Sequence, residues 1–236
     1  MRIEIWSDVV CPWCYIGKRR LEAALASFEH ADEVEVVYRS FQLDPSAPAT
    51  STESIAESLG RKYGGGVAAG EQMIQRVTEV AAAEGLAFDY AHAERGSTRD
   101  AHRLLHLARD AGGSRLQGEL KEALLASYFL HARSVSDHDA LRKVAVDVGL
   151  DEATVTQVLD SDQYGEEVRA DLAQARAFGA SGVPFFVIDR RYGISGAQPA
   201  EVFSQALRQA WADGHPAVAM VGGDADAACG PDGCAV

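Results

Sequence analysis

The sequence has few cysteines, an excess of acidic over basic residues and no long apolar run. Each of these features excludes certain classes of function. Four cysteines in 236 residues are too few to replace a hydrophobic core, so we expect them to serve chemistry. The formal net charge of −13 excludes a global basic field that would bind nucleic acid phosphates or anionic membranes. No apolar stretch reaches the length that crosses a bilayer, and no basic and apolar leader opens the chain. We therefore expect a cytoplasmic protein whose partners are proteins or small thiols.

The motif Cys11-Pro12-Trp13-Cys14 is the most informative stretch of the sequence. It follows a short strand-like segment and opens an amphipathic helix, where Pro12 suits the first helical position because no intrahelical N–H bond is lost. A cysteine at a helix N-terminus faces unpaired backbone N–H groups and the positive end of the helix dipole, which stabilise a thiolate. We therefore predict that Cys11 is the nucleophile and has the lower thiol pKa. Cys14 lies almost one helical turn later on the same side and is the predicted resolving thiol.

The four cysteines also allow other interpretations. Two alternatives to a redox pair exist for Cys11 and Cys14. They could form one half of a zinc site that Cys229 and Cys234 complete, or they could be small buried hydrophobic residues. Cys229 and Cys234 flank a turn-forming Gly-Pro-Asp-Gly spacer that lets their thiols meet. This second pair is either a redox pair that exchanges with the first, half of the zinc site, or a passive reducible loop. A tryptophan between two thiols at a helix start favours redox chemistry.

Hydrophobic periodicity predicts an α/β architecture for the first part of the chain. Residues 2–7 alternate between apolar and polar side chains, and residues 34–41 are rich in β-branched and aromatic ones, so both read as strands. The helix that begins with the CPWC motif joins them and extends to about residue 30. A strand, a helix and a strand in this order predict a parallel pair with a right-handed crossover.

The rest of the chain divides into a helical block, a hairpin, a helix and a tail. From about residue 45 to 179 the period is helical, with six apolar stripes separated by glycines and capping residues. The second of these stripes ends before Gly112, and the third begins at Leu116. A β-hairpin with strands at 184–188 and 192–196 is predicted to follow. After it we expect a helix at 199–214 and a flexible cysteine-containing tail at 215–236.

A CxxC motif after a first strand, paired with Val183-Pro184 opening a strand some 170 residues later, resembles the DsbA family of thioredoxin-like proteins. The stretches around the two motifs, residues 7–17 and 181–186, resemble the FrnE-type branch of cytosolic dithiol oxidoreductases in particular. The resemblance implies a thioredoxin-like α/β fold with an all-helical insertion. Its core would comprise residues 1–44 and 180–214, and the insertion would comprise about 45–179.

The family resemblance assigns a role to each motif residue. It implies that Cys11 attacks, that Cys14 resolves, and that Pro184 is a cis-proline beside the disulfide. Val183 would offer its backbone to an extended substrate, and Trp13 would contact substrate as well. Asp8, three residues before the motif, is a candidate modulator that disfavours the thiolate or relays protons, or else an Asx turn that holds the loop.

We predict from these features a thiol–disulfide oxidoreductase or isomerase that acts on protein or small-molecule disulfides through a mixed disulfide. No metal and no bound cofactor are expected, and glutathione or thioredoxin is the candidate electron partner. The sequence does not indicate the oligomeric state. One rival is a glutathione-dependent isomerase or transferase of the kappa and hydroxychromene carboxylate isomerase type, which generally lacks the second cysteine. The other rival is a zinc-holding interaction module.

His102 and His106 have the spacing of a metal-binding pair on one helix face, but the glutamate of the zincin motif is missing. We therefore interpret the two histidines as surface residues or as residues that pack inside the helical insertion.

Overall fold

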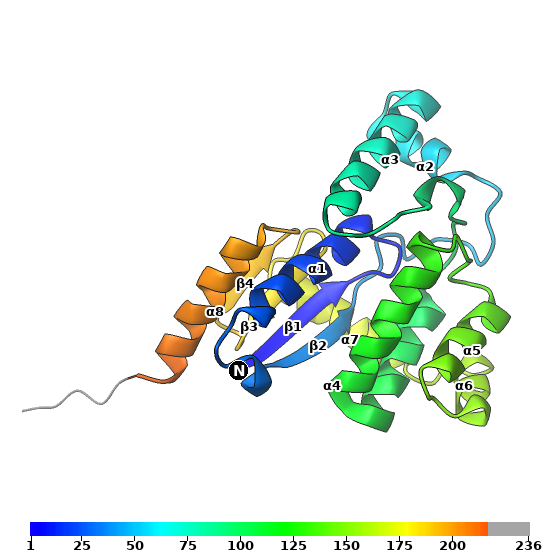
Figure 1. Ribbon diagram of the computed structural model, residues 1–236. Coiled ribbons are helices and arrows are strands. Elements are labelled where there is room, and N and C mark those ends of the chain that lie inside the picture. Colours follow the sequence, from blue (N-terminus) through cyan, green and yellow to red (C-terminus); the bar gives the residue numbers. More distant parts are fainter. Residues whose placement is uncertain (217–236) are drawn as a thin grey trace, which may run out of the picture.

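A four-stranded sheet forms the centre of the protein, whose computed structural model describes residues 1–216 (Figure 1). The strand order is β2-β1-β3-β4. The first two strands are parallel, and β1 with β3 and β3 with β4 are antiparallel. The strands have these bounds: β1 Arg2–Ser7, β2 Glu35–Ser40, β3 Phe185–Ile188 and β4 Tyr192–Ser195. The predicted parallel pair and the predicted hairpin are both confirmed.

The central strand β1 is buried on both faces of the sheet. Ile3 and Ile5 pack on one face in a core that includes Phe203 and Leu207, whereas Trp6 packs on the other face against Ala175. Alternation along a strand sends successive side chains to opposite faces, so two separate layers of helices cover β1.

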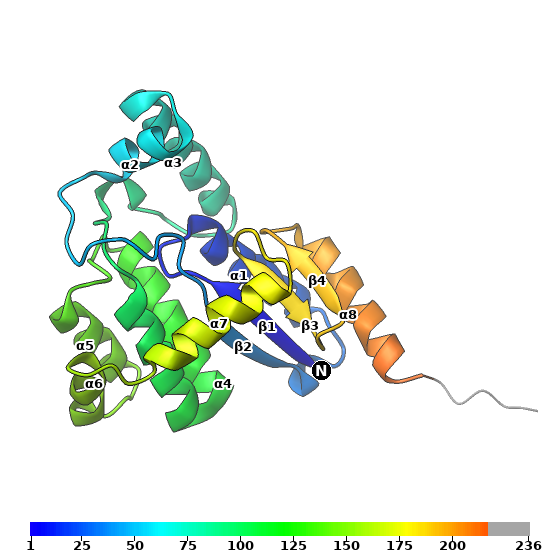
Figure 2. The same cartoon turned by 180° about the vertical axis from the view of Figure 1, so that it is seen from behind.

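Three helices cover the two faces of the sheet. Helices α1 (Pro12–Ala26) and α8 (Ala200–Gly214) lie on one face, and α7 (Gly165–Ala177) lies on the other, as the two opposite views show (Figures 1 and 2). Helix α1 ends four residues before the predicted position. The chain then turns through Ser27 and the short 3-10 helix Ala31–Glu33 into β2.

The remaining helices lie between β2 and β3 in the sequence and beside the sheet in space (Figure 1). Their bounds are α2 Ile55–Tyr63, α3 Gly66–Ala83, α4 Arg99–Phe129, α5 His138–Asp147 and α6 Glu152–Leu159, with a 3-10 turn at Tyr90–His92. No helix in residues 1–216 is long and apolar enough to cross a membrane.

Helix α4 is a helical hairpin that reverses at Gly112 and Gly113. Gly113 has φ 69° and ψ −163°, a backbone conformation that side chains with a Cβ rarely adopt. The Gln117 Nε2 atom donates to the Leu105 carbonyl oxygen at 3.3 Å, whereas twelve residues of a straight helix would span roughly 18 Å. The two arms are therefore antiparallel, and the reversal falls where the sequence separates the second apolar stripe from the third.

Side chains from α4 and α7 form hydrogen bonds with the backbone along the open edge of strand β2. The Gln117 amide accepts from the Tyr38 backbone N–H at 2.9 Å and donates to the Tyr38 carbonyl oxygen at 3.0 Å. The Asp171 carboxylate accepts from the Ser40 N–H at 2.8 Å. Two buried side chains thus satisfy backbone groups that a further strand would otherwise pair.

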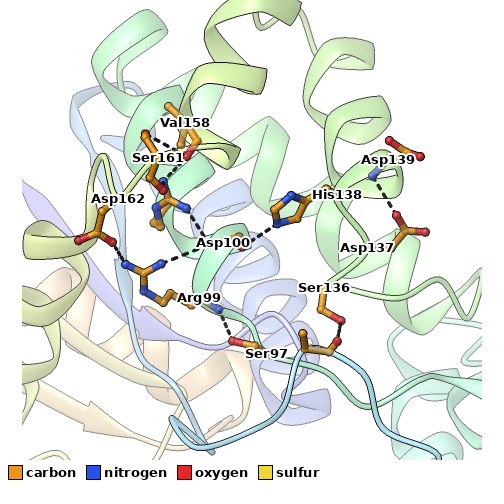
Figure 3. A network of polar contacts seen from close by, with 12 residues as sticks. Ser97, Arg99, Asp100, Ser136, Asp137, His138, Asp139, Val158, Ser161 and Asp162 are labelled. Carbon is orange, nitrogen blue, oxygen red and sulfur yellow. Dashed lines mark hydrogen bonds and ion pairs between the residues drawn. The ribbon is translucent and has the colours of Figure 1, made fainter.

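A polar network joins the start of α4 to α5 and α6 (Figure 3). Asp100 accepts from Arg103 at 2.8 Å and from His138 at 2.9 Å (Figure 3). The buried Arg103 guanidinium also donates to the backbone carbonyls of Val158 and Ser161. These bonds fix the first arm of α4, whose His102 is hydrogen-bonded to Asp8 in the loop before the CPWC motif.

Candidate active site

The CPWC motif lies where β1 ends and α1 begins. Cys11 is the N-cap of α1 with φ −92° and ψ 112°, Pro12 occupies the first helical position, and the Cys14 N–H donates to the Cys11 carbonyl at 3.0 Å. Both thiols are free and about 3% exposed. Trp13, between them, is 42% exposed and presents a flat apolar surface beside the thiols.

The loop before β3 meets the CPWC motif from the far end of the chain. The Cys11 Sγ atom donates to the Val183 carbonyl oxygen at 3.5 Å, and the Val183–Pro184 peptide bond is cis, as the sequence predicts. Gly17, one turn after Cys14, makes this approach possible, because a Cβ there would lie 3.0 Å from the Pro184 ring. The structure therefore brings Cys11, Cys14, Val183 and Pro184 together.

Asp8 is a buried carboxylate that accepts hydrogen bonds from its own loop, from the loop after β2 and from the helical insertion. Its Oδ1 accepts from the Val9 N–H at 2.8 Å and from His102 Nε2 at 3.1 Å, and its Oδ2 accepts from the Leu43 N–H at 2.8 Å. Burial alone would raise the pKa of Asp8, but these hydrogen bonds and the nearby Lys121 charge outweigh it and lower the pKa. The resulting negative charge acts on Cys11 and raises the pKa of that thiol further.

The two thiols of the reduced site titrate as a pair. The hydrogen bond between the Cys11 thiol and Cys14, together with burial, raises the pKa of Cys11. Burial opposes ionisation of Cys14 too, but the hydrogen bond from the Cys11 thiol and the Lys121 charge lower the pKa of Cys14. Because these effects belong to the pair, the assignment of Cys11 as the thiol with the lower pKa stays a prediction.

Lys121 is the most unexpected group at the site. It lies on the second arm of α4, its side chain is fully buried, and its Nζ has no hydrogen-bond partner within residues 1–216. Burial lowers the pKa of Lys121 to about 8. Its Nζ lies 5.7 Å from the centroid of the Tyr38 ring. Sequence reasoning missed this lysine, although one signal existed: position 121 is one helical turn after Gln117 and one before Leu124, on the inward face.

His102 and His106 face inward and have different partners. His102 is fully buried against Asp8, and its Nδ1 has no partner among the described residues. His106 Nε2 lies 3.1 Å from both the Ser40 hydroxyl and the Asp171 carboxylate. The described part of the chain contains no group of three or more His, Cys, Asp or Glu side chains placed to hold a metal ion. Cys229 and Cys234, which the zinc interpretation needs, lie outside the described residues.

A cavity of about 320 Å³ opens beside the loop that precedes the motif. Asp8 and Val10 form part of its wall, and the buried rings of Tyr90 and Tyr128 form another part. Arg95 stands at its margin, where it is paired with Asp44 and Glu53. The cavity therefore lies between the loop that precedes the dithiol and the helices α2 and α4.

A dithiol at the start of a crossover helix, a cis-proline loop opposite it and a helical segment between two halves of one sheet define a thioredoxin-like protein of the DsbA class. The sequence pattern of the DSBA-like thioredoxin domain family matches residues 2–208. The chain belongs to this family, and the predicted thioredoxin-like fold with a helical insertion is confirmed.

Solved structures agree with this membership. A probable DsbA oxidoreductase from Streptomyces coelicolor is 49% identical, with a TM-score of 0.85, over 100% of this chain and 99% of the other. A 2-hydroxychromene-2-carboxylate isomerase shares the fold with a TM-score of 0.66 at 12% identity, over 91% of this chain and 98% of that one. The cytosolic disulfide reductase DsbM from Pseudomonas aeruginosa, solved with glutathione, has a TM-score of 0.57 at 19% identity, over 89% and 98%. The last two similarities concern the fold alone.

Proposed function

We propose that the protein is a thiol–disulfide oxidoreductase that works through the Cys11–Cys14 dithiol and a mixed disulfide with its substrate. The observation that carries this proposal is the position of the Cys11 sulfur, at the N-cap of α1 and 3.5 Å from the Val183 carbonyl oxygen. Membership of a DsbA-like family supports the reaction class. The second cysteine, one helical turn away, supplies the group that completes the exchange.

The reaction consists of two exchanges at sulfur. In the reducing direction, a Cys11 thiolate attacks one sulfur of the substrate disulfide, and the other sulfur leaves as a thiolate. A Cys14 thiolate then attacks the Cys11 sulfur, the remaining substrate sulfur leaves, and the Cys11–Cys14 disulfide forms. Two electrons pass to the substrate, and the two protons of the dithiol end on the two released thiols. The reverse sequence oxidises a substrate dithiol.

The surroundings of Cys11 suit both protein and small-molecule substrates. We assign Trp13 and the Val183 backbone to substrate contact, because the Trp13 side chain is exposed between the two cysteines of the motif and the Val183 carbonyl oxygen lies 3.5 Å from the Cys11 sulfur. The cavity beside Asp8 and Tyr90 has room for part of a small thiol. A structure of DsbM with glutathione supports glutathione as one such partner here. A dithiol that cycles through reduction suits a cytoplasmic protein.

The rival functions differ from this one in what they need. An isomerase of the hydroxychromene carboxylate type shares the fold but generally does not use a second cysteine, and here Cys14 is held beside Cys11 by a backbone hydrogen bond. A zinc module needs Cys229 and Cys234 as ligands in addition to the CPWC pair. We therefore favour the oxidoreductase.

The decisive experiment compares single-cysteine variants in a chain that lacks the tail cysteines (Cys229→Ser and Cys234→Ser). Oxidised glutathione is added, and intact masses are measured. Cys14→Ser is expected to accumulate a glutathione adduct on Cys11, whereas the unsubstituted dithiol is expected to pass to the internal disulfide. Equal adducts on both proteins, or no adduct on either one, would overturn the proposed function.

The reduction potential then decides the direction of electron flow. Equilibration with glutathione buffers measures it. A value near that of thioredoxin, about −270 mV, would make the protein a reductase, and a value near about −120 mV, as for DsbA, would make it an oxidant.

A further inference from the structure

A second cavity, separate from the dithiol, lies between helix α1 and the second arm of α4, and strand β2 also lines it (Figure 1). Its volume is about 580 Å³, within the range of about 300–1,000 Å³ that small-molecule sites occupy. Neither cysteine of the CPWC motif lines this cavity, which we call the α1–α4 groove. Its apolar surface comes mainly from Leu21, Leu25, Val36, Tyr38 and Ala123.

The charged side chains of the groove are paired with one another. The charged residues that line it are Lys18, Glu22, Arg115, Glu119 and Glu122. Lys18 forms ion pairs with Glu22 and Glu122. The same two carboxylates also bind Arg19, and Arg115 pairs with Glu119. An ion that entered the groove would lose hydration without meeting an unpaired counter-charge, so the groove favours an uncharged molecule.

Tyr38 brings a polar group without a partner to this apolar surface. The residue is only 7% exposed, and Gln117 binds its backbone groups, whereas its hydroxyl has no hydrogen bond to any residue in 1–216. The unpartnered side-chain atoms that are sealed from solvent belong to Ser7, His102 and Lys121, so the Tyr38 hydroxyl is reached through the groove that it lines. Burial raises the pKa of Tyr38, so its hydroxyl keeps its proton and can donate to a ligand.

Gly118 leaves the α4 wall of the groove open. It lies in the helical part of the second arm, and a Cβ at this position would meet no heavy atom within 4 Å. The helix does not require glycine there, and glycine in a helix interior lowers the stability of the helix. The missing side chain therefore adds to the volume of the groove and not to the packing of the fold.

We propose that the α1–α4 groove binds an uncharged, mainly apolar small molecule that carries a carbonyl group, and that the Tyr38 hydroxyl donates a hydrogen bond to this carbonyl. The apolar walls favour binding because they remove apolar surface of the ligand from water. The paired charges at the rim disfavour ions, and the hydroxyl selects for an acceptor, since a buried hydroxyl without a partner is costly. The inference does not depend on the proposed function, because no cysteine takes part in it.

The test uses prodan, an uncharged naphthyl ketone whose fluorescence shifts to the blue in apolar surroundings. The full chain is titrated with prodan, and three naphthalenes that differ in one substituent then compete for the site. Among these competitors, 2-acetylnaphthalene has a carbonyl group, 2-ethylnaphthalene has no polar group, and 2-naphthoate is an anion. The anion is expected to compete more weakly than the two uncharged compounds, because the groove offers it no free cation.

Two substitutions place the site and its hydrogen bond. Gly118→Leu fills the groove, so it should weaken the binding of both uncharged compounds by at least about tenfold. Tyr38→Phe keeps the ring and removes the hydroxyl, so it should weaken 2-acetylnaphthalene by about fivefold and leave 2-ethylnaphthalene unchanged. Gln75→Leu, which adds a leucine to the exposed face of α3, is the matched control and should change neither affinity.

Circular dichroism and thermal melting show whether each variant is folded, and Ala123→Leu, at another lining position, replaces Gly118→Leu if the latter does not fold. Equal losses for the ketone and the hydrocarbon in Tyr38→Phe would overturn the inference. Parent affinity in the folded groove-filling variant, or no binding of prodan to the parent protein up to the solubility of the dye, would do the same. Sedimentation gives the remaining outcome: a parent dimer that Gly118→Leu converts to a monomer would mean that a second copy of the chain covers the groove, which also overturns the inference.

Discussion

At the scale of single residues, the surroundings of the dithiol are set by a buried pair, Asp8 and His102. The carboxylate is ionised, since His102 and the Leu43 N–H lower its pKa against the effect of burial. Burial lowers the pKa of His102 as well, and the bond to Asp8 opposes this only in part. A negative charge therefore faces a neutral imidazole.

This pair predicts a loss of stability on mild acidification. The pKa of His102 is 6.5 in an unfolded chain and lower in the folded one, so below pH 6.5 the unfolded state binds a proton that the folded state does not. The free energy of unfolding from urea denaturation should therefore fall as the pH drops from 7.5 to 5.5. In His102→Gln, which can still donate to Asp8, this part of the decrease should disappear.

His92 provides a control, because its pKa is shifted in the direction opposite to that of His102. The hydrogen bond to Asp89 raises the pKa of His92, so its contribution is present below pH 6.5 and is lost as the pH rises through its folded pKa. Because His92 is exposed, His92→Gln should leave the acid-side decrease in place. An unaltered decrease in His102→Gln would show that another group causes it.

At the scale of elements, the reversal inside α4 positions Lys121 and His102 on facing arms. Gly113 makes this reversal, with a positive φ of 69°. Gly118, further along the second arm, is helical, and a Cβ there would meet nothing within 4 Å. The same helix thus contains one glycine that the backbone requires and one that it does not.

We therefore predict opposite effects for two alanine substitutions. Gly113→Ala should lower the free energy of unfolding by about 1–3 kcal/mol, because alanine is strained in this conformation. Gly118→Ala should raise it by about 0.5–1 kcal/mol, because it reduces the entropy of the unfolded chain. Chemical denaturation of both variants measures the two changes in the free energy of unfolding. A stable Gly113→Ala protein would contradict the hairpin.

The covered edge of β2 gives a second prediction at this scale. In Gln117→Leu, the buried N–H and carbonyl of Tyr38 lose their partners, so the free energy of unfolding should fall by about 1–3 kcal/mol. Gln75→Leu is the matched control, because Gln75 is exposed on α3 and its amide donates to the exposed helix residue Glu79. The control should stay within about 0.5 kcal/mol of the parent. Equal stabilities of the two variants would mean that water satisfies the Tyr38 groups.

Local sequence patterns predicted the elements well, and the site only in part. Alternation and turn residues gave the four strands, and the break between the apolar stripes at Gly112 gave the two arms of α4. The charge of Lys121, which lowers the pKa of Cys14, reaches the dithiol only through the tertiary fold, so the pattern around the motif does not reveal it. The spacing of Lys121 from Gln117 and Leu124 indicates the inward face of the helix, but a single lysine among apolar residues of a helix is also what a solvent-facing position looks like.

At the scale of the whole molecule, the excess of acidic residues should affect which disulfides reach the site. The formal net charge of −13 produces a negative field that attracts cations and repels anions over roughly one Debye length, about 10 Å at 0.1 M salt. Under the proposed function, selectivity by charge would add to the substrate contacts that we assign to Trp13 and Val183.

We predict that the reduced protein reacts faster with cystamine, a dication, than with 3,3′-dithiodipropionate, a dianion, at low ionic strength. Rates are measured under pseudo-first-order conditions, with the neutral 2-hydroxyethyl disulfide as the reference for intrinsic reactivity. The ratio of the two rates should shrink as potassium chloride is added. A ratio that is independent of salt would show that the field does not reach Cys11.

The pairing of β1 with β3 has a consequence for the protein during its synthesis. Cys11 leaves the ribosome 172 residues before Val183, which it contacts in the folded protein. At about 5–20 residues per second, this interval lasts roughly 10–30 s. Throughout this interval β1 lacks β3 as its neighbour, and both thiols of the CPWC motif are accessible to other disulfides. Under the proposed function, the nascent chain is therefore itself a substrate for thiol exchange before it becomes a catalyst of it, and a reducing partner at the ribosome would protect the CPWC motif until β3 has been synthesised.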